Sequence, residues 1–141
     1  MTAEAELMRL CDRLVAIAAE NLKLYATMPA ATRAEERQLE GCLKPSLAEW
    51  DKVTARILDL DTLPKTPEGI NAVARAALAE APRRPNGEII TRDLCEYLTW
   101  SVLEAIEPDA NALIKADVRN ANEAVFLRMA SVPRRQREDR S

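Results

Sequence analysis

The sequence predicts an all-α protein: a bundle of five to six helices, with long N-terminal and C-terminal helices and no sheet. Apolar residues recur at helical spacing through most of the 141 residues, and the chain has only 3 glycines and five aromatic residues. Alanine and leucine dominate the apolar positions and favour helix, whereas strands draw on alternating aromatic and β-branched residues. We expect residues 1–132 to form a single α-helical domain and residues 133–141 to be a polar, disordered tail.

The first helix is expected over residues 3–27 and carries a heptad ladder of the coiled-coil type. The ladder consists of Leu7, Leu10, Leu14, Ile17, Asn21, Leu24 and Met28. Such a stripe needs a second helix to cover it, from this chain or from another copy. We take Leu7, Leu10, Leu14, Ile17, Asn21 and Leu24 as the candidate partner-binding residues. Asn21 either pairs with its own copy and fixes the register, or lies at the rim of a monomeric bundle.

Start signals mark the following helices. Thr32 and Glu35 have the spacing of a capping box, and Thr66-Pro67-Glu68 combines an N-cap residue with proline at the first helical position. Pro45 either kinks the second helix or makes it restart. The loop around Arg83 and Arg84 is expected to be solvated.

Two further helices are expected over residues 90–107 and 110–131. The first of them has an apolar face that we expect to point inward, formed by Ile90, Leu94, Tyr97, Leu98, Ser101, Val102 and Ala105. Its other face carries the acidic residues Asp93, Glu96, Glu104 and Glu107, with Trp100 among them. We expect these acids to be solvated and Trp100 to be covered by another helix or to belong to a partner surface.

The chemistry available to this chain is narrow. It contains no histidine, which removes His-based acid–base catalysis and imidazole metal sites. We therefore expect a non-enzymatic protein with no cofactor. The alternative is a magnesium-dependent enzyme, similar to the all-α nucleotide pyrophosphohydrolases, in which the carboxylates of the 93–107 helix hold the ion.

Charge and cysteine usage limit the partners and the compartment. The net charge is −3 and the 3 cysteines form no CxxC pair, so we expect buried thiols in a reducing, cytoplasmic location. No stretch is long and apolar enough to anchor in a membrane. The arginines of the tail, Arg134, Arg135 and Arg137, could contact DNA. Glu138 and Asp139 follow them, however, and we expect no nucleic-acid partner.

Several short segments carry a resemblance to known sequences. They are Trp50-Asp51-Lys52-Val53 with Arg56-Ile57, Thr66-Pro67-Glu68-Gly69-Ile70, Ala74-Arg75-Ala76-Ala77-Leu78, and Leu98-Thr99-Trp100-Ser101-Val102. Over these segments the chain resembles a set of small uncharacterised all-helical proteins encoded in GC-rich bacterial and prophage genomes. The resemblance implies a helical fold and no particular activity.

These observations favour a protein that acts by self-association or by binding another protein through its first helix. Charged residues at Leu14 and Ile17 should then separate a homo-oligomer, or release a protein partner, without unfolding the chain. Loss of helicity in that variant would show that the stripe is core.

Overall fold

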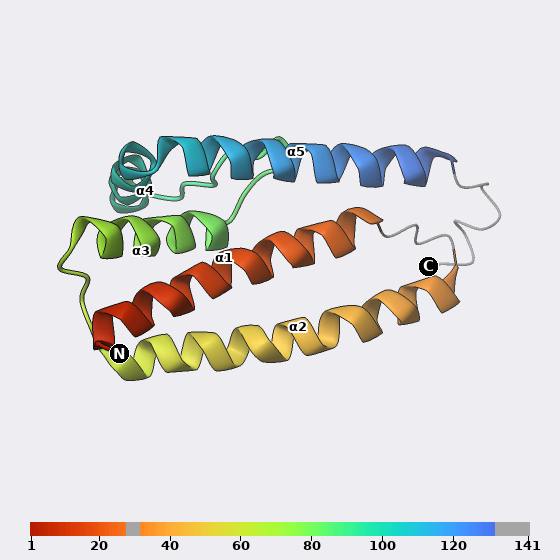
Figure 1. Ribbon diagram of the computed structural model, residues 1–141. Helices are drawn as coiled ribbons and strands as arrows, with labels where there is room; N and C mark the ends of the chain where they lie inside the picture. The colour runs from red at the N-terminus through yellow and green to blue at the C-terminus, as the bar shows by residue number, and fades with distance from the viewer. Residues whose placement is uncertain (28–31, 132–141) are drawn as a thin grey trace.

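The computed structural model describes residues 1–27 and 32–131, and within them it is all-α, as the sequence predicts. Its five helices are α1 (Ala3–Thr27), α2 (Arg33–Leu60), α3 (Pro67–Glu80), α4 (Leu94–Ile106) and α5 (Pro108–Ser131). Figure 1 shows α1 running between α2 on one side and α3 and α5 on the other, with α4 crossing near the start of α5. The predictions for Met28 and for the tail over residues 133–141 lie outside the described residues.

The core forms around α1. The buried residues of its stripe pack with Val53 of α2 and with Ala72 and Ala76 of α3. Half-buried apolar side chains from both helices widen this contact; they include Trp50, Ile57, Leu60 and Val73. The alanines of α3 let its backbone lie close to α1, because a methyl side chain adds little thickness between two helices.

The start signals in the sequence are confirmed. The Thr32 hydroxyl accepts a hydrogen bond from the Glu35 N–H at 3.2 Å, and Thr66 accepts one from the Gly69 N–H at 3.1 Å. Helix α2 continues through Pro45 without a restart. Capping therefore fixes where α2 and α3 begin, and a solvent-exposed proline inside α2 is tolerated.

The bounds of the fourth helix differ from those that the sequence predicts. Residues 90–93 lie before it, Asp93 is its N-cap, and Ile90 is half-buried in the preceding loop. Within that loop, Arg83 and Ile89 form an isolated antiparallel bridge around a turn that contains Gly87. Cys42 and Cys95 are exposed and only Cys11 is buried, which corrects the expectation of three buried thiols.

Glu4 at the start of α1 ties that helix to the start of α3. Its carboxylate accepts hydrogen bonds from the Lys65 N–H at 3.0 Å, the Thr66 N–H at 2.9 Å and the Thr66 hydroxyl at 2.8 Å. These bonds, above all the one from the Thr66 backbone, hold the pKa of Glu4 below its ordinary value of 4.5. A charged Glu4 therefore stabilises the folded state.

This contact makes part of the stability dependent on pH. Because the folded pKa of Glu4 is depressed, its contribution is present above the unfolded value of 4.5 and is lost as pH falls through the folded pKa. We expect Glu4→Gln to lower the urea midpoint of unfolding at neutral pH. At a pH below the folded pKa of Glu4, the variant and the wild type should have the same midpoint. Glu40→Gln, at an exposed position of α2, is the control and should leave the midpoint unchanged at both pH values. An equal effect of both substitutions would contradict this account.

No helix within the described residues combines the length and apolarity that a membrane crossing requires.

Candidate functional site

Helix α4 is turned so that its apolar face points to solvent. Four large side chains of this face are between 54% and 70% exposed, namely Leu94, Tyr97, Leu98 and Val102. No residue of α4 is buried. The prediction that this face lies inward is therefore wrong. We use the name α4 apolar face for these four residues together with the exposed Ala105.

The acidic face of α4 lies toward the rest of the protein, which explains the orientation of the helix. Glu107 accepts a hydrogen bond from the Arg75 guanidinium of α3 at 2.8 Å, and its side chain is only 17% exposed. Glu96 accepts one from the Arg92 N–H at 2.8 Å. A charge-assisted hydrogen bond to α3 thus holds the end of α4 against the bundle, together with the half-buried side chains of Trp100, Leu103 and Ile106.

The carboxylates of the 93–107 segment do not converge on a metal position. Asp93 caps α4 by accepting the Glu96 N–H at 2.9 Å, whereas Glu107 is paired with Arg75. Within residues 1–27 and 32–131, no group of three or more potential ligands could hold a metal ion. The described part of the chain therefore gives the magnesium alternative no support.

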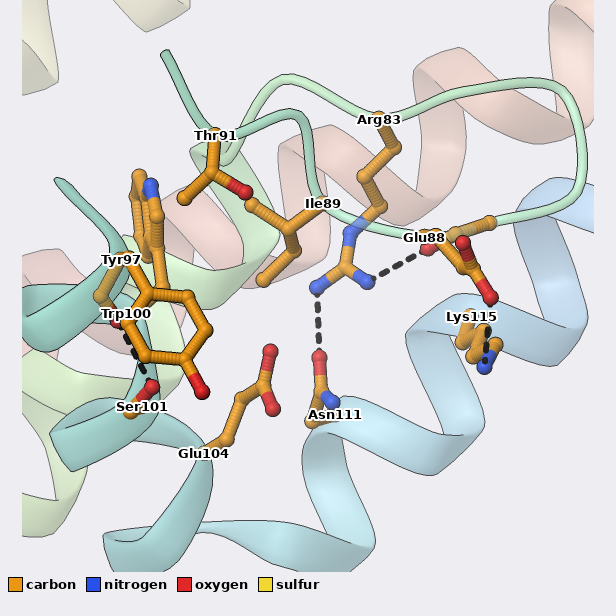
Figure 2. A pocket seen from close by; sticks show the side chains of 11 residues that line it. Arg83, Glu88, Ile89, Thr91, Tyr97, Trp100, Ser101, Glu104, Asn111 and Lys115 are labelled. Carbon is orange, nitrogen blue, oxygen red and sulfur yellow. Dashed lines mark hydrogen bonds and ion pairs between the residues drawn. The ribbon is translucent and has the colours of Figure 1, made fainter. Parts of the chain in front are cut away.

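A cavity of about 340 Å³ lies between α4, α5 and the loop that precedes α4. Figure 2 shows Tyr97, Trp100, Ser101 and Glu104 of α4 on one wall. Asn111 and Lys115 of α5 form another wall, and the loop supplies Arg83, Glu88, Ile89 and Thr91. Trp100 is half-buried here, so it is partly covered from within the chain and remains open to a ligand.

Arg83 holds the loop wall of the cavity in place. Its guanidinium donates to the Gly87 carbonyl at 2.8 Å, to the Leu78 carbonyl at 3.0 Å and to the Asn111 amide oxygen at 2.9 Å. These bonds join the loop to the end of α3 and to α5. Burial lowers the pKa of Arg83, and the nearby charge of Glu104 opposes that shift. The expectation of a solvated arginine is wrong for Arg83, although Arg84 is exposed.

The charges around the cavity are unequally satisfied. Lys115 lies 3.8 Å from the Glu88 carboxylate, and Arg83 is occupied by two carbonyls and an amide. Glu104 is half-buried and points into the cavity in Figure 2. Among the described residues, no donor forms a hydrogen bond or ion pair with its carboxylate. Among the described residues, the cavity thus has two groups that lack a direct partner, the Glu104 carboxylate and the buried Nε of Arg83.

The candidate partner-binding residues on α1 lie mostly inside the protein. Leu7, Leu10, Leu14 and Ile17 are between 0% and 7% exposed. The Asn21 side chain accepts a hydrogen bond from the Ser46 hydroxyl of α2 at 2.5 Å, which is the rim position of a bundle. Leu24 is half-buried. The chain's own α2 and α3 cover this stripe, so a partner could reach it only if they moved away.

Two features of the site were missed by sequence reasoning. The inward orientation of the acids depends on Arg75, which lies 32 residues before Glu107, and no local pattern reports such a pair. The role of Arg83 has a weak signal, since arginine just after a helix can donate to the last carbonyls of that helix. The turn at Gly87, by contrast, was predicted from the sequence, because Asn-Gly is typical of a turn with positive φ.

Comparison of the chain with protein-family models, with curated proteins and with solved structures finds no significant match.

Proposed function

We propose that this chain acts by protein association and that the α4 apolar face is the contact surface between two copies. The observation that carries the proposal is the exposure of Leu94, Tyr97, Leu98 and Val102, at 54% to 70%, on one side of a regular helix. A large apolar side chain contributes about 1.5–3 kcal/mol when it is fully buried. Gathered apolar side chains on a surface are typical of interaction sites, whereas single ones are ordinary.

The order of side chains along α4 suits an antiparallel pair of α4 helices. If the two copies cross between Thr99 and Trp100, Leu94 of one copy lies opposite Ala105 of the other. Tyr97 then lies opposite Val102, and Leu98 opposite Ser101. Each large residue meets a smaller one, which favours close packing of the two helices. Leu94, Leu98 and Val102 also form a ridge of four-residue spacing, the commonest ridge in helix packing.

This surface replaces the α1 stripe as our choice for the contact. A contact through Leu14 and Ile17 would first require removal of α2 and α3 from the core, at a large cost in buried apolar area. The α4 apolar face needs no such rearrangement. A role for the α1 residues in binding a partner stays a prediction, and we rank it second for this reason.

The test compares the solution mass of the wild type with that of two leucine variants. We expect the wild type to have twice the chain mass of 15.7 kDa in light scattering after gel filtration, and Leu98→Glu to have the single chain mass. Helicity should be unchanged, because Leu98 is 54% exposed and packs in no core.

Leu58→Glu is the matched control, since Leu58 is 74% exposed on α2, away from α4. It should keep the dimer mass. A wild type that remains at 15.7 kDa at every concentration would overturn the proposal. So would a dimer that Leu98→Glu leaves intact.

A further inference from the structure

We propose that the cavity between α1, α5 and the end of α3 binds an aliphatic chain of about six carbons with an uncharged polar head group. The cavity has a volume of about 190 Å³, and Asp117 is the only charged residue among the described residues that line it. No residue of the α4 apolar face lies among them. This inference therefore goes beyond the proposed function.

The lengths of the helices create this space. α3 has 14 residues, whereas α1 has 25 and α5 has 24, and Figure 1 shows α3 ending about midway along α1. Near that end the cavity is lined by three alanines, Ala18 and Ala19 of α1 and Ala79 of α3. A methyl side chain leaves room that a leucine would fill, so the close packing of the core is interrupted at this junction.

The walls of the cavity suit a linear aliphatic chain. Its larger lining residues include Val15, Leu22, Ile114 and Val118, and no aromatic ring is among the described ones. A cavity of about 150 Å³ with apolar walls stays dry and binds a molecule of the size of benzene. The space continues along α1 and α5 into a second hollow of about 270 Å³, which shares Leu22 with the first. This extended shape favours a chain over a ring.

The charges where the two hollows meet select an uncharged head group. Asp117 lines both hollows, and Lys23 and Asn120 line the second one. An anionic head would lie near Asp117 and a cationic head near Lys23, so a charged group meets repulsion from one of them and also loses its hydration. A hydroxyl instead donates to the Asp117 carboxylate or accepts from the Asn120 amide.

The test follows methyl signals of the full-length protein in ¹H–¹³C NMR during titration with straight-chain 1-alkanols. We expect 1-hexanol to shift the methyl signals of Ile114 and Val118 saturably, and to leave those of Leu98 and Val102 on the α4 apolar face in place. Each methylene added between 1-butanol and 1-hexanol should tighten binding about fourfold, because it is buried against apolar walls. Hexanoate and hexylammonium should both bind more weakly than 1-hexanol.

Two alanine positions of α1 separate binding in the cavity from general attraction to apolar surface. Ala19→Leu places a larger side chain where both hollows meet. It should weaken 1-hexanol binding about tenfold and leave the helicity in circular dichroism unchanged, because Ala19 is exposed. Ala16→Leu, the same change at another exposed position of α1, is the control and should alter binding less than about twofold.

Three results would each overturn the inference. The first is that 1-hexanol shifts neither Ile114 nor Val118 at millimolar concentration. The second is that hexanoate or hexylammonium binds as tightly as 1-hexanol. The third is that Ala19→Leu and Ala16→Leu change the affinity alike.

Discussion

An aspartate at position 17 is expected to unfold the chain rather than to separate two copies of it. Ile17 is 0% exposed and packs in the cluster that joins α1 to α2 and α3. Truncation of a buried isoleucine costs about 2–5 kcal/mol. A buried carboxylate without a partner adds several kcal/mol more, of the same order as the whole stability of a typical domain.

Circular dichroism with a thermal melt measures this outcome. We expect Ile17→Asp to lose most of its helicity at 25 °C or to melt without a cooperative transition. Leu58→Asp should keep both, because Leu58 is 74% exposed. If Ile17→Asp stayed helical and only its mass changed, the α1 stripe would be a contact between copies, and the core described above would be incorrect.

Alanine in place of Gly87 is expected to cause the second large loss of stability. Gly87 has φ 90°, in the left-handed region that favours glycine. An added Cβ would also overlap the backbone carbonyl of Lys115 on α5, which cannot turn aside as a flexible side chain could. Strain and overlap together should lower the free energy of unfolding by about 2–4 kcal/mol.

Gly41→Ala is the matched control for this substitution in urea unfolding. Gly41 lies in the interior of α2, and an added Cβ there meets nothing within 4 Å. Alanine should stabilise the protein at this position by about 0.4–1 kcal/mol. A lower free energy of unfolding for Gly87→Ala and a higher one for Gly41→Ala would confirm that the loop packs against α5. A stable Gly87→Ala variant would show that this contact is absent.

The sequence predicted those parts of the fold that depend on neighbouring residues. Thr32 and Thr66 indicate where α2 and α3 begin, because the hydrogen bonds of a helix cap join residues only three positions apart. The bounds of α1 and its inward stripe followed from heptad spacing. The spacing could not tell whether the covering helix belongs to this chain, since α2, α3 or a second copy would satisfy the same stripe.

The orientation of α4 could not be predicted because it depends on distant residues. Its amphipathic pattern defines two faces, and the ordinary rule places the apolar one inward. In the structure the opposite face lies inward, where Arg75 of α3 pairs with Glu107 at 2.8 Å and Leu103 and Ile106 are half-buried. The cavity depends likewise on Arg83, which reaches from the loop to Asn111 of α5. Long-range polar pairs of this kind leave no periodic signal in one sequence.

The most direct test of the α4 contact is an isotope-filtered NOE experiment on a mixture of ¹³C-labelled and unlabelled wild-type protein. Leu94 and Ala105 lie about 16 Å apart along one helix, at about 1.5 Å per residue, so they cannot give an NOE within a copy. The antiparallel pair predicts an NOE between the Leu94 methyls of one copy and the Ala105 methyl of the other. Intermolecular NOEs that involve only other surfaces would contradict the proposed role of α4. The absence of any intermolecular NOE in a concentrated sample would contradict it as well.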